Sequence, residues 1–274
     1  MFDELVVVKG AGDLASGVAY RLHHAGFRVI MTEIAQPTVV RRTVSFAQAV
    51  FDGATLVEGL CARLVATPDA ALTVARARDI AVLIDPCAHV VAQLRPPVLI
   101  DAIIAKRNIG TRIDDAPMVI GLGPGFRAGV DVHAVVETNR GHRLGRVILD
   151  GEAEPDTGVP APVGGHGAER VLRAPADGIF IGVAAIGDRV GPEEVLGFVA
   201  DAPVRSPFEG YVRGLIQTGV PVLKGMKIGD VDPRATREHC FTISDKALAI
   251  GGGVLEATLY LLERQPLRRA LSAV

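Results

Sequence analysis

A glycine-rich turn near the start of the chain has the residue types and the spacing of a phosphate-binding loop. The apolar run Leu5–Val8 leads into GAGDLA at residues 10–15, which matches the pattern G-x-G-x-x-A. In this pattern Gly10 permits a sharp turn, Gly12 lets the backbone approach a pyrophosphate, and Ala15 allows close helix–strand packing. A helix that begins here would direct free N–H groups and its positive dipole end toward an anion. The same residues are also compatible with a tight strand-to-helix corner that binds nothing.

An acidic residue and two arginines follow where a nucleotide site would use them. Glu33 closes the next apolar run, roughly 20 positions after the glycines, where an acidic side chain hydrogen-bonds a ribose. Its charge would repel a 2′-phosphate, so Glu33 favours NAD over NADP. Arg41 and Arg42 could hold a phosphate through paired hydrogen bonds, or they could form a solvated basic surface. The ligand that these residues predict is NAD or another nucleotide.

A second glycine turn, GLGPGF at residues 121–126, also follows an apolar run. Gly121, Gly123 and Gly125 would lie at the carboxyl end of a strand, the edge at which open α/β sheets bind ligands. We therefore expect both glycine turns to share one cleft. Further polar candidates near that edge are Asp101, Lys106, Arg107, Asn108, Asp114, Asp115, Glu137, Asn139 and Arg140.

Three residues are candidates for catalysis. Asp131 and His133 are two positions apart and would share one face of a strand, either as an acid–base pair or as a structural pair. Cys240 follows His239. A thiolate stabilised by this imidazole or by Lys246 could act as a nucleophile or soft-metal ligand, whereas a buried Cys240 would simply pack as a small hydrophobe. The chain contains no H-E-x-x-H or G-x-S-x-G motif, and we predict no metal site.

The elements that would position these residues alternate between strands and helices. Apolar runs separated by helical patterns predict a Rossmann-like parallel sheet with helices on both faces. Strands are expected at Leu5–Val8, Arg28–Thr32, Arg63–Ala66, Ile80–Ile84, Pro97–Ile100 and Met118–Leu122, and helices at Leu14–His24, Asp69–Ala77 and 87–94. Residues 130–149 are expected to form two strands joined at NRGH.

An internal repeat follows the first domain. Pro175, Gly178, Gly187 and Val190 recur 32 positions later as Pro207, Gly210, Gly219 and Val222 (207 − 175 = 32). The pattern resembles the barrel-sandwich hybrid of biotinyl and lipoyl domains, but the link Phe198–Val204 lacks the carrier lysine. We expect a nucleotide-binding domain at 1–150, a Gly/Pro-rich crossing at 151–168, a β domain at 169–233, and a C-terminal helical segment at 234–274 that packs back on the first domain.

Composition narrows the classes of function. The 274 residues are 49% hydrophobic and 22% charged, which is typical of a folded chain with sizeable cores. A net charge of −2 without a long basic run argues against nucleic acid as the main partner. Three cysteines without a C-x-x-C motif fit a reducing cytoplasm. No apolar stretch approaches the ~20 residues of a membrane span, so we expect a cytoplasmic protein without membrane contact.

Six long blocks of the chain read KGAGDLASGVAYRL, RRTVSFAQAV, IGLGPGFRAGVDVHAVVETNRGHRLGRVI, ERVLRAPADGIF, GLIQTGVPVLKGMKIGDVDPR and CFTISDKALAIGGGVLEA. Together these blocks resemble the YqeB family. The resemblance implies an accessory protein of the selenium-dependent molybdenum hydroxylase system, a maturation factor that helps assemble or insert the molybdenum cofactor. It implies a hydroxylase or its cofactor machinery as partner and a molybdopterin-type cofactor as an alternative ligand. The chain is also a candidate homo-oligomer.

Two classes of function are thus compatible with the sequence. The first is a maturation protein that binds a nucleotide-type or molybdopterin-type small molecule. The second is an enzyme, either a NAD-dependent oxidoreductase or a thiol-dependent sulfur or selenium transferase. We favour the first because the chain lacks a complete catalytic set.

Overall fold

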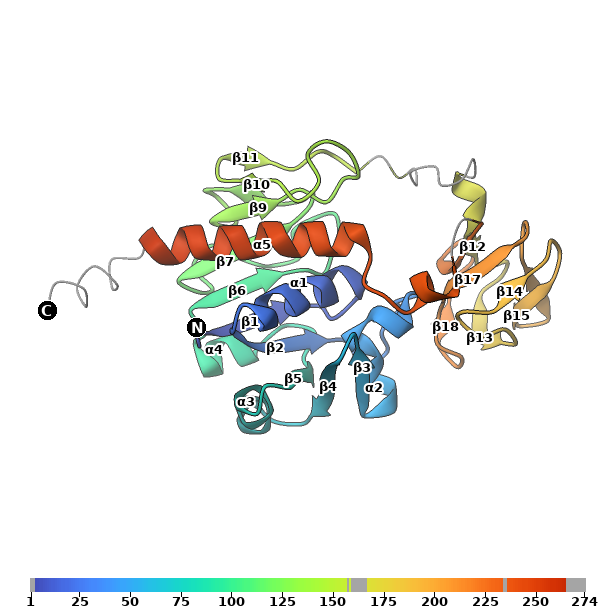
Figure 1. The fold of residues 1–274 in the computed structure, drawn as a ribbon, viewed down its shortest axis with the longest axis horizontal. Helices are drawn as coiled ribbons and strands as arrows, with labels where there is room; N and C mark the ends of the chain where they lie inside the picture. The colour runs from blue at the N-terminus through green and yellow to red at the C-terminus, as the bar shows by residue number, and fades with distance from the viewer. Residues whose placement is uncertain (1–2, 157, 159–166, 234–235, 265–274) are drawn as a thin grey trace, which may run out of the picture.

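The structure is a computed structural model that describes residues 3–156, 158, 167–233 and 236–264. Its largest element is a nine-stranded sheet with the order β10-β9-β7-β6-β1-β2-β5-β4-β3 (Figure 1). The strands are β1 (Leu5–Lys9), β2 (Arg28–Glu33), β3 (Ala54–Val57), β4 (Leu60–Val65), β5 (Ile80–Ile84), β6 (Val98–Asp101), β7 (Met118–Leu122), β9 (Ala134–Val136) and β10 (Val147–Ile148). Only β3 and β10, at the two edges, run antiparallel to their neighbours.

Helices cover both faces of this sheet, which explains why its central strands are apolar throughout. On one face lie α1 (Asp13–His24) and α5 (Asp245–Arg264), and on the other lie α3 (Pro68–Arg76) and α4 (Val90–Leu94). Because successive side chains of a strand point to opposite faces, Val6 and Val8 pack with α1 and α5. Val7 packs in the core that includes α3 and α4. The short helix α2 (Ala49–Asp52) precedes β3.

The expected fold class, a Rossmann-like parallel sheet with a barrel-sandwich-hybrid domain, is wrong. The large sheet is mixed, because a two-residue turn at Glu58 and Gly59 folds β3 back against β4, and β10 folds back against β9. The remaining strands form small antiparallel sheets. One has two strands, β8 (Arg127–Ala128) and β11 (Gly151–Glu152), and two have four strands each.

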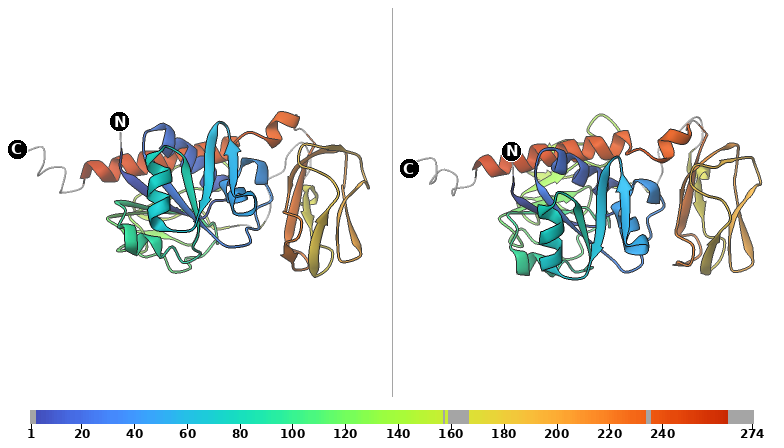
Figure 2. Two further views of the ribbon diagram at one scale, coloured as in Figure 1. Left: turned by 90° about the horizontal axis from the view of Figure 1, so that it is seen from below. Right: turned by 60° about the horizontal axis from the view of Figure 1, so that its bottom comes forward.

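The two four-stranded sheets reflect the internal repeat. Their orders are β12-β19-β17-β14 and β16-β15-β13-β18. The repeated residues pair across the repeats, since Gly178 lies opposite Val222 and Gly210 lies opposite Val190. One apolar core lies between the two sheets. The sheets form a separate unit beside the large sheet (Figure 2). These strands are β12 (Val171–Arg173), β13 (Gly178–Gly182), β14 (Arg189–Val190), β15 (Val195–Val199), β16 (Ala202–Arg205), β17 (Gly210–Leu215), β18 (Pro221–Val222) and β19 (Lys227–Asp232).

Hydrogen bonds connect the small sheets to the segment that follows β2. The N–H of Leu215 donates to the carbonyl of Val40 over 2.8 Å. Arg42 donates through Nε to the carbonyl of Leu215 (2.7 Å) and through Nη1 to Oε1 of Gln217 (2.8 Å). A 3₁₀ turn at Arg237–Cys240 then leads from β19 to α5.

Helices α1 and α5 run side by side in the same direction and approach closely at glycines. A Cβ on Gly17 would lie 2.6 Å from the carbonyl oxygen of Ala247, and one on Gly251 would lie 2.5 Å from that of Gly17. Hence the first turns of both helices lie at the same edge of the sheet (Figure 1). No helix in the described part of the chain is long and apolar enough to cross a membrane.

Candidate functional site

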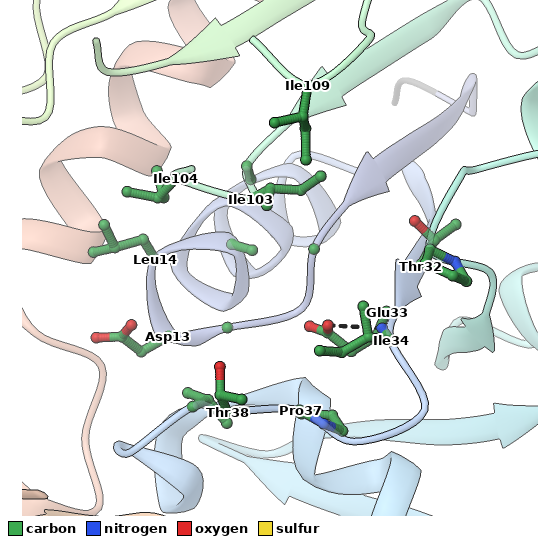
Figure 3. Close-up of a pocket in the computed structure, with 16 residues that line it drawn as sticks. Asp13, Leu14, Thr32, Glu33, Ile34, Pro37, Thr38, Ile103, Ile104 and Ile109 are labelled. Atoms are coloured by element: carbon green, nitrogen blue, oxygen red, sulfur yellow. Dashed lines mark hydrogen bonds between the residues drawn. The ribbon is translucent and has the colours of Figure 1, made fainter. Parts of the chain in front are cut away.

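A cavity of about 470 Å³ opens at the carboxyl ends of β1, β2 and β6 (Figure 3). The glycine turn and the first turn of α1 form its floor, and the segments after β2 and β6 form its sides. The lining residues are Gly10, Gly12, Asp13, Leu14, Ala15, Thr32, Glu33, Ile34, Pro37, Thr38, Val39, Pro86, Ala102, Ile103, Ile104 and Ile109. A volume of this size is within the range of small-molecule sites.

The glycine turn leaves the N-terminus of α1 open to this cavity. Gly10 adopts a φ of +89°, which favours glycine, and its N–H donates to the carbonyl of Thr32 (2.9 Å). Gly12 occupies the N-cap position of α1, and no side chain of the described residues caps the helix there. A Cβ on Gly12 would meet no described atom within 4 Å. The first N–H groups of α1 can therefore bind an anionic group in the cavity.

Glu33 is held at the cavity by the same turn. Its Oε2 accepts a hydrogen bond from the N–H of Ala11 (2.9 Å), and its Oε1 accepts one from the N–H of Ile34 (2.8 Å). Burial raises the pKa of Glu33, and the two N–H donors oppose that rise. Each carboxylate oxygen retains a lone pair that could accept a hydrogen bond from a ligand hydroxyl.

The cavity walls combine an apolar surface with two acidic groups. Ile34, Pro37, Val39, Ile103, Ile104 and Ile109 form the apolar part, which suits the faces of a flat ring. Asp13 and Glu33 supply the acidic groups, and none of the described lining residues is Lys, Arg or His. A ligand with several negative charges would thus need a cation from beyond the lining.

The structure places Arg41 and Arg42 outside this lining. Arg41 is buried and donates through Nη2 to the carbonyls of His239 (3.2 Å) and Thr242 (3.3 Å), while its Nη1 lies 3.9 Å from Asp13. Arg42 binds the small sheets as described above. Neither arginine forms a solvated basic surface. Arg42 instead connects the segment after β2 to the β domain itself, and Arg41 connects it to the segment between the β domain and α5.

The second glycine turn is filled by the protein's own atoms. A Cβ on Gly121 would lie 2.6 Å from the ring of Phe126, and one on Gly125 would lie 2.5 Å from the backbone of Arg107. A Cβ on Gly123 would overlap the hydroxyl of Thr138. The structure therefore does not bring Gly121, Gly123 and Gly125 into the cavity with Gly10 and Gly12.

Asp131 and His133 precede β9 and do not line the cavity. His133 precedes β9, and its Nδ1 accepts a hydrogen bond from the N–H of Val119 at the start of β7 (3.0 Å). Asp131 accepts one from the N–H of Arg127 (2.8 Å). Burial lowers the pKa of His133. Both side chains accept hydrogen bonds from backbone N–H groups outside the cavity lining, as a structural pair would.

Cys240 lies in the core of the small sheets and is fully buried. Burial raises the pKa of its thiol, although Arg213 and Arg41 nearby oppose that rise. The raised pKa disfavours the thiolate, which is the reactive form. This placement agrees with the packing interpretation of Cys240.

Thiol labelling should separate the three cysteines. Cys87 is exposed, Cys61 is half-buried and Cys240 is buried. We expect a thiol reagent at pH 8 to modify Cys87 first and Cys240 only after denaturant is added. Cys240→Ala should leave ligand binding unchanged and lower the free energy of unfolding by about 1 kcal/mol, because a buried sulfur loses its contacts. Rapid labelling of Cys240 in the native protein would contradict its burial.

Most of the other polar candidates have hydrogen-bond or ion-pair partners within the protein. Lys9, Asp101 and Thr111 form a buried network in which Thr111 donates to Asp101 and Lys9 donates to Thr111, both over 2.5 Å. Lys106 binds Asp156 (2.6 Å), and Arg112 binds Asp114. Asn108 bonds within its own loop, and Arg140 binds Asp245. The described residues contain no group of three His, Cys, Asp or Glu side chains that could hold a metal ion.

Sequence reasoning missed the apolar walls of the cavity. They come from IAQPTVV after Glu33 and from the segment after β6. The sequence did contain a signal for these walls, because both stretches carry several apolar residues but show no helix or strand pattern. Such residues need a covering surface or a ligand.

A comparison with curated proteins gives a close sequence relative. No protein-family model matches the chain. The chain is 51% identical over 261 residues to the protein described as uncharacterized protein YqeB of Escherichia coli strain K12. The match covers 95% of this chain and 48% of that protein, so the chain spans about half the length of its relative.

Solved structures give only distant matches. An aspartoacylase family protein from Mesorhizobium loti matches with 12% identity, 86% coverage of each chain and a TM-score of 0.27. The ectoine utilization protein EutE (DoeB) from Ruegeria pomeroyi matches with 10% identity, coverage of 84% of this chain and 85% of that one, and a TM-score of 0.26. A succinylglutamate desuccinylase/aspartoacylase from Rhodobacter sphaeroides matches 30% of this chain and 29% of that chain, with 24% identity and a TM-score of 0.21.

Proposed function

Because the chain is a sequence relative of YqeB, we propose that it is an accessory protein that binds a small cofactor for a selenium-dependent molybdenum hydroxylase. The ligand class is a flat heterocycle that carries phosphate, either a nucleotide such as NAD or a molybdopterin-type cofactor. The observation that carries this proposal is the open cavity above the uncapped N-terminus of α1, with Glu33 at its rim.

Each part of the cavity suits one part of such a ligand. The isoleucine-rich wall would contact the faces of the heterocycle. The free N–H groups at the start of α1 would bind phosphate oxygens. Glu33 would accept hydrogen bonds from hydroxyl groups, as an acidic residue at this position does in dinucleotide sites. The burial of Cys240 does not favour the alternative, a thiol-dependent transferase.

Titration calorimetry with a ligand panel tests the proposal. We expect NAD to bind at least about 10-fold more tightly than NADP, a difference of about 1.4 kcal/mol, because the Glu33 carboxylate repels a 2′-phosphate. Glu33→Gln should reduce the ratio of the affinities for NAD and NADP. The panel also contains molybdopterin released from a hydroxylase, so that the two cofactor classes are compared directly. Absence of binding by every member of the panel would reject the proposal.

The accessory role needs a separate assay. Purified chain with bound cofactor should increase the activity of a cofactor-free molybdenum hydroxylase above that obtained with the cofactor alone. A Glu33→Gln variant that binds the cofactor weakly should give a smaller increase. If the hydroxylase activity did not change, the proposed accessory role would be wrong, although the chain could still bind the cofactor.

A further inference from the structure

The second residue of α5, Lys246, lies at the same sheet edge as the cavity. Helices α1 and α5 run in parallel, and Gly17 of α1 contacts Ala247 of α5. Their first turns are therefore neighbours, which places Lys246 close to Asp13. Asp13 lines the cavity on the side that faces the segment leading into α5 (Figure 3).

The charged neighbours of Lys246 come from four parts of the chain, and most of them already have partners. They are Asp13 on α1, Glu137 and Arg140 after β9, Asp245 on α5, and Asp156 after β11. Arg140 binds both oxygens of Asp245 (2.7 and 3.1 Å), which lowers the pKa of Asp245 to about 2.

The remaining carboxylates are also engaged. Glu137 is buried and accepts hydrogen bonds from the N–H groups of Asn139 and Glu154, each over 2.7 Å. Asp156 binds Lys106, and Asp13 lies 3.9 Å from Arg41. The half-buried ammonium of Lys246 has no hydrogen-bond or ion-pair partner among the described residues.

A half-buried ammonium without a direct partner is stabilised when a ligand supplies an oxygen of opposite charge. Burial is the main cause that lowers the pKa of Lys246, and Arg140 lowers it further, while Asp13, Glu137 and Asp245 oppose the shift. The lining of the cavity holds two carboxylates and, among its described residues, no cationic side chain. A ligand phosphate in the cavity therefore lacks a cation in the lining, and Lys246 lacks a direct hydrogen-bond or ion-pair partner among the described residues.

We propose that Lys246 binds the phosphate of the ligand whose heterocycle occupies the cavity. This inference rests on the proposed function and narrows it to ligands in which phosphate extends from the cavity past Asp13 toward α5. Nucleotides and phosphorylated pterins share this chemistry. A nucleoside or a pterin without phosphate would fill the cavity but leave Lys246 unpaired.

Calorimetry with matched ligand pairs tests this role. The pairs are adenosine against ADP and neopterin against neopterin monophosphate. For the pair that binds, we expect the wild-type chain to bind the phosphorylated member at least about 10-fold more tightly. In Lys246→Met, the ratio of the two affinities should fall close to one, while the affinity for the member without phosphate stays unchanged. In Lys246→Arg, most of the ratio should remain. Lys224→Met, which changes an exposed lysine of the small sheets, should behave as wild type.

A pH series adds a signature that a purely structural lysine would not give. The phosphate-dependent ratio should decline as pH rises through the lowered pKa of Lys246, and this decline should be absent in Lys246→Arg, because arginine stays protonated. An unchanged ratio in Lys246→Met, with cooperative thermal unfolding retained, would overturn the inference and leave the proposed function intact. If the wild type bound none of the four compounds, the inference would fail. The proposed function would fail with it only if NAD and molybdopterin also did not bind.

Discussion

Replacing Gly253 by alanine is expected to lower the free energy of unfolding by about 3 kcal/mol. Gly253 is buried in α5 where that helix crosses the turn before β10. An added Cβ would overlap the carbonyl oxygen of Gly145 and lie 2.9 Å from a methyl group of Val136. Backbone atoms cannot move aside as a flexible side chain can, so α5 would have to shift away from the sheet. Forced overpacking of this kind typically costs 1–3 kcal/mol.

The neighbouring glycine provides a matched control. Gly252 lies in the same helix, and a Cβ there would meet no described atom within 4 Å. Gly252→Ala should therefore stabilise the chain by about 1 kcal/mol, because alanine favours a helix interior more than glycine does. Thermal unfolding should show opposite shifts of roughly 2–4 °C per kcal/mol for a chain of this size. Shifts of the same sign in both variants would contradict the described packing of α5.

The sequence predicts the buried strands well because each is a continuous apolar run between turn residues. The ranges Ile80–Ile84 and Met118–Leu122 agree with β5 and β7, and Leu5–Val8 falls one residue short of β1. The edge strand β3 was missed. Its turn places Glu58 at a φ of +45°, and glutamate is not a residue that signals such a turn. Leu56 of β3 is exposed, which removes the alternation typical of a half-buried strand. Because β3 was not predicted, we expected a parallel sheet.

In the candidate site, the residues that adjacent elements position were predictable from sequence, and those that distant contacts position were not. Gly10, Gly12, Ala15 and Glu33 line one cavity because two adjacent strands and one turn position them. Arg41 and Arg42 lie only a few residues further along, yet their orientation depends on carbonyl groups roughly 170 to 200 positions away. Sequence spacing holds no information on such partners.

The two glycine turns show a second limit of prediction from sequence. Gly12 follows β1 and faces open space, whereas Gly121 lies within β7 and faces the ring of Phe126, yet the two belong to similar glycine motifs. A glycine can be required by a ligand or by a neighbouring side chain, and the sequence pattern is the same in both cases. Only the packing of the folded chain separates the two.

Gly12→Asn is expected to weaken binding of the cavity's ligand by at least about 100-fold, or about 2.7 kcal/mol, without destabilising the fold. Gly12 has a φ of −65°, which any residue adopts, and a side chain there would enter open space. Asparagine at an N-cap accepts a hydrogen bond from an N–H of the first turn. It would therefore occupy the donors that we propose for the phosphate and would also fill part of the cavity.

The stability of this variant makes the test decisive. An asparagine N-cap is a few tenths of a kcal/mol more favourable than glycine, so the midpoint of thermal unfolding should stay constant or rise slightly. Gly59→Asn is the control, because it introduces the same side chain into open space at the exposed β3–β4 turn. It should bind the ligand as wild type does. If Gly12→Asn retained full affinity in calorimetry, the N-terminus of α1 would not be the phosphate site, since its first N–H groups cannot serve the new cap and a ligand at once.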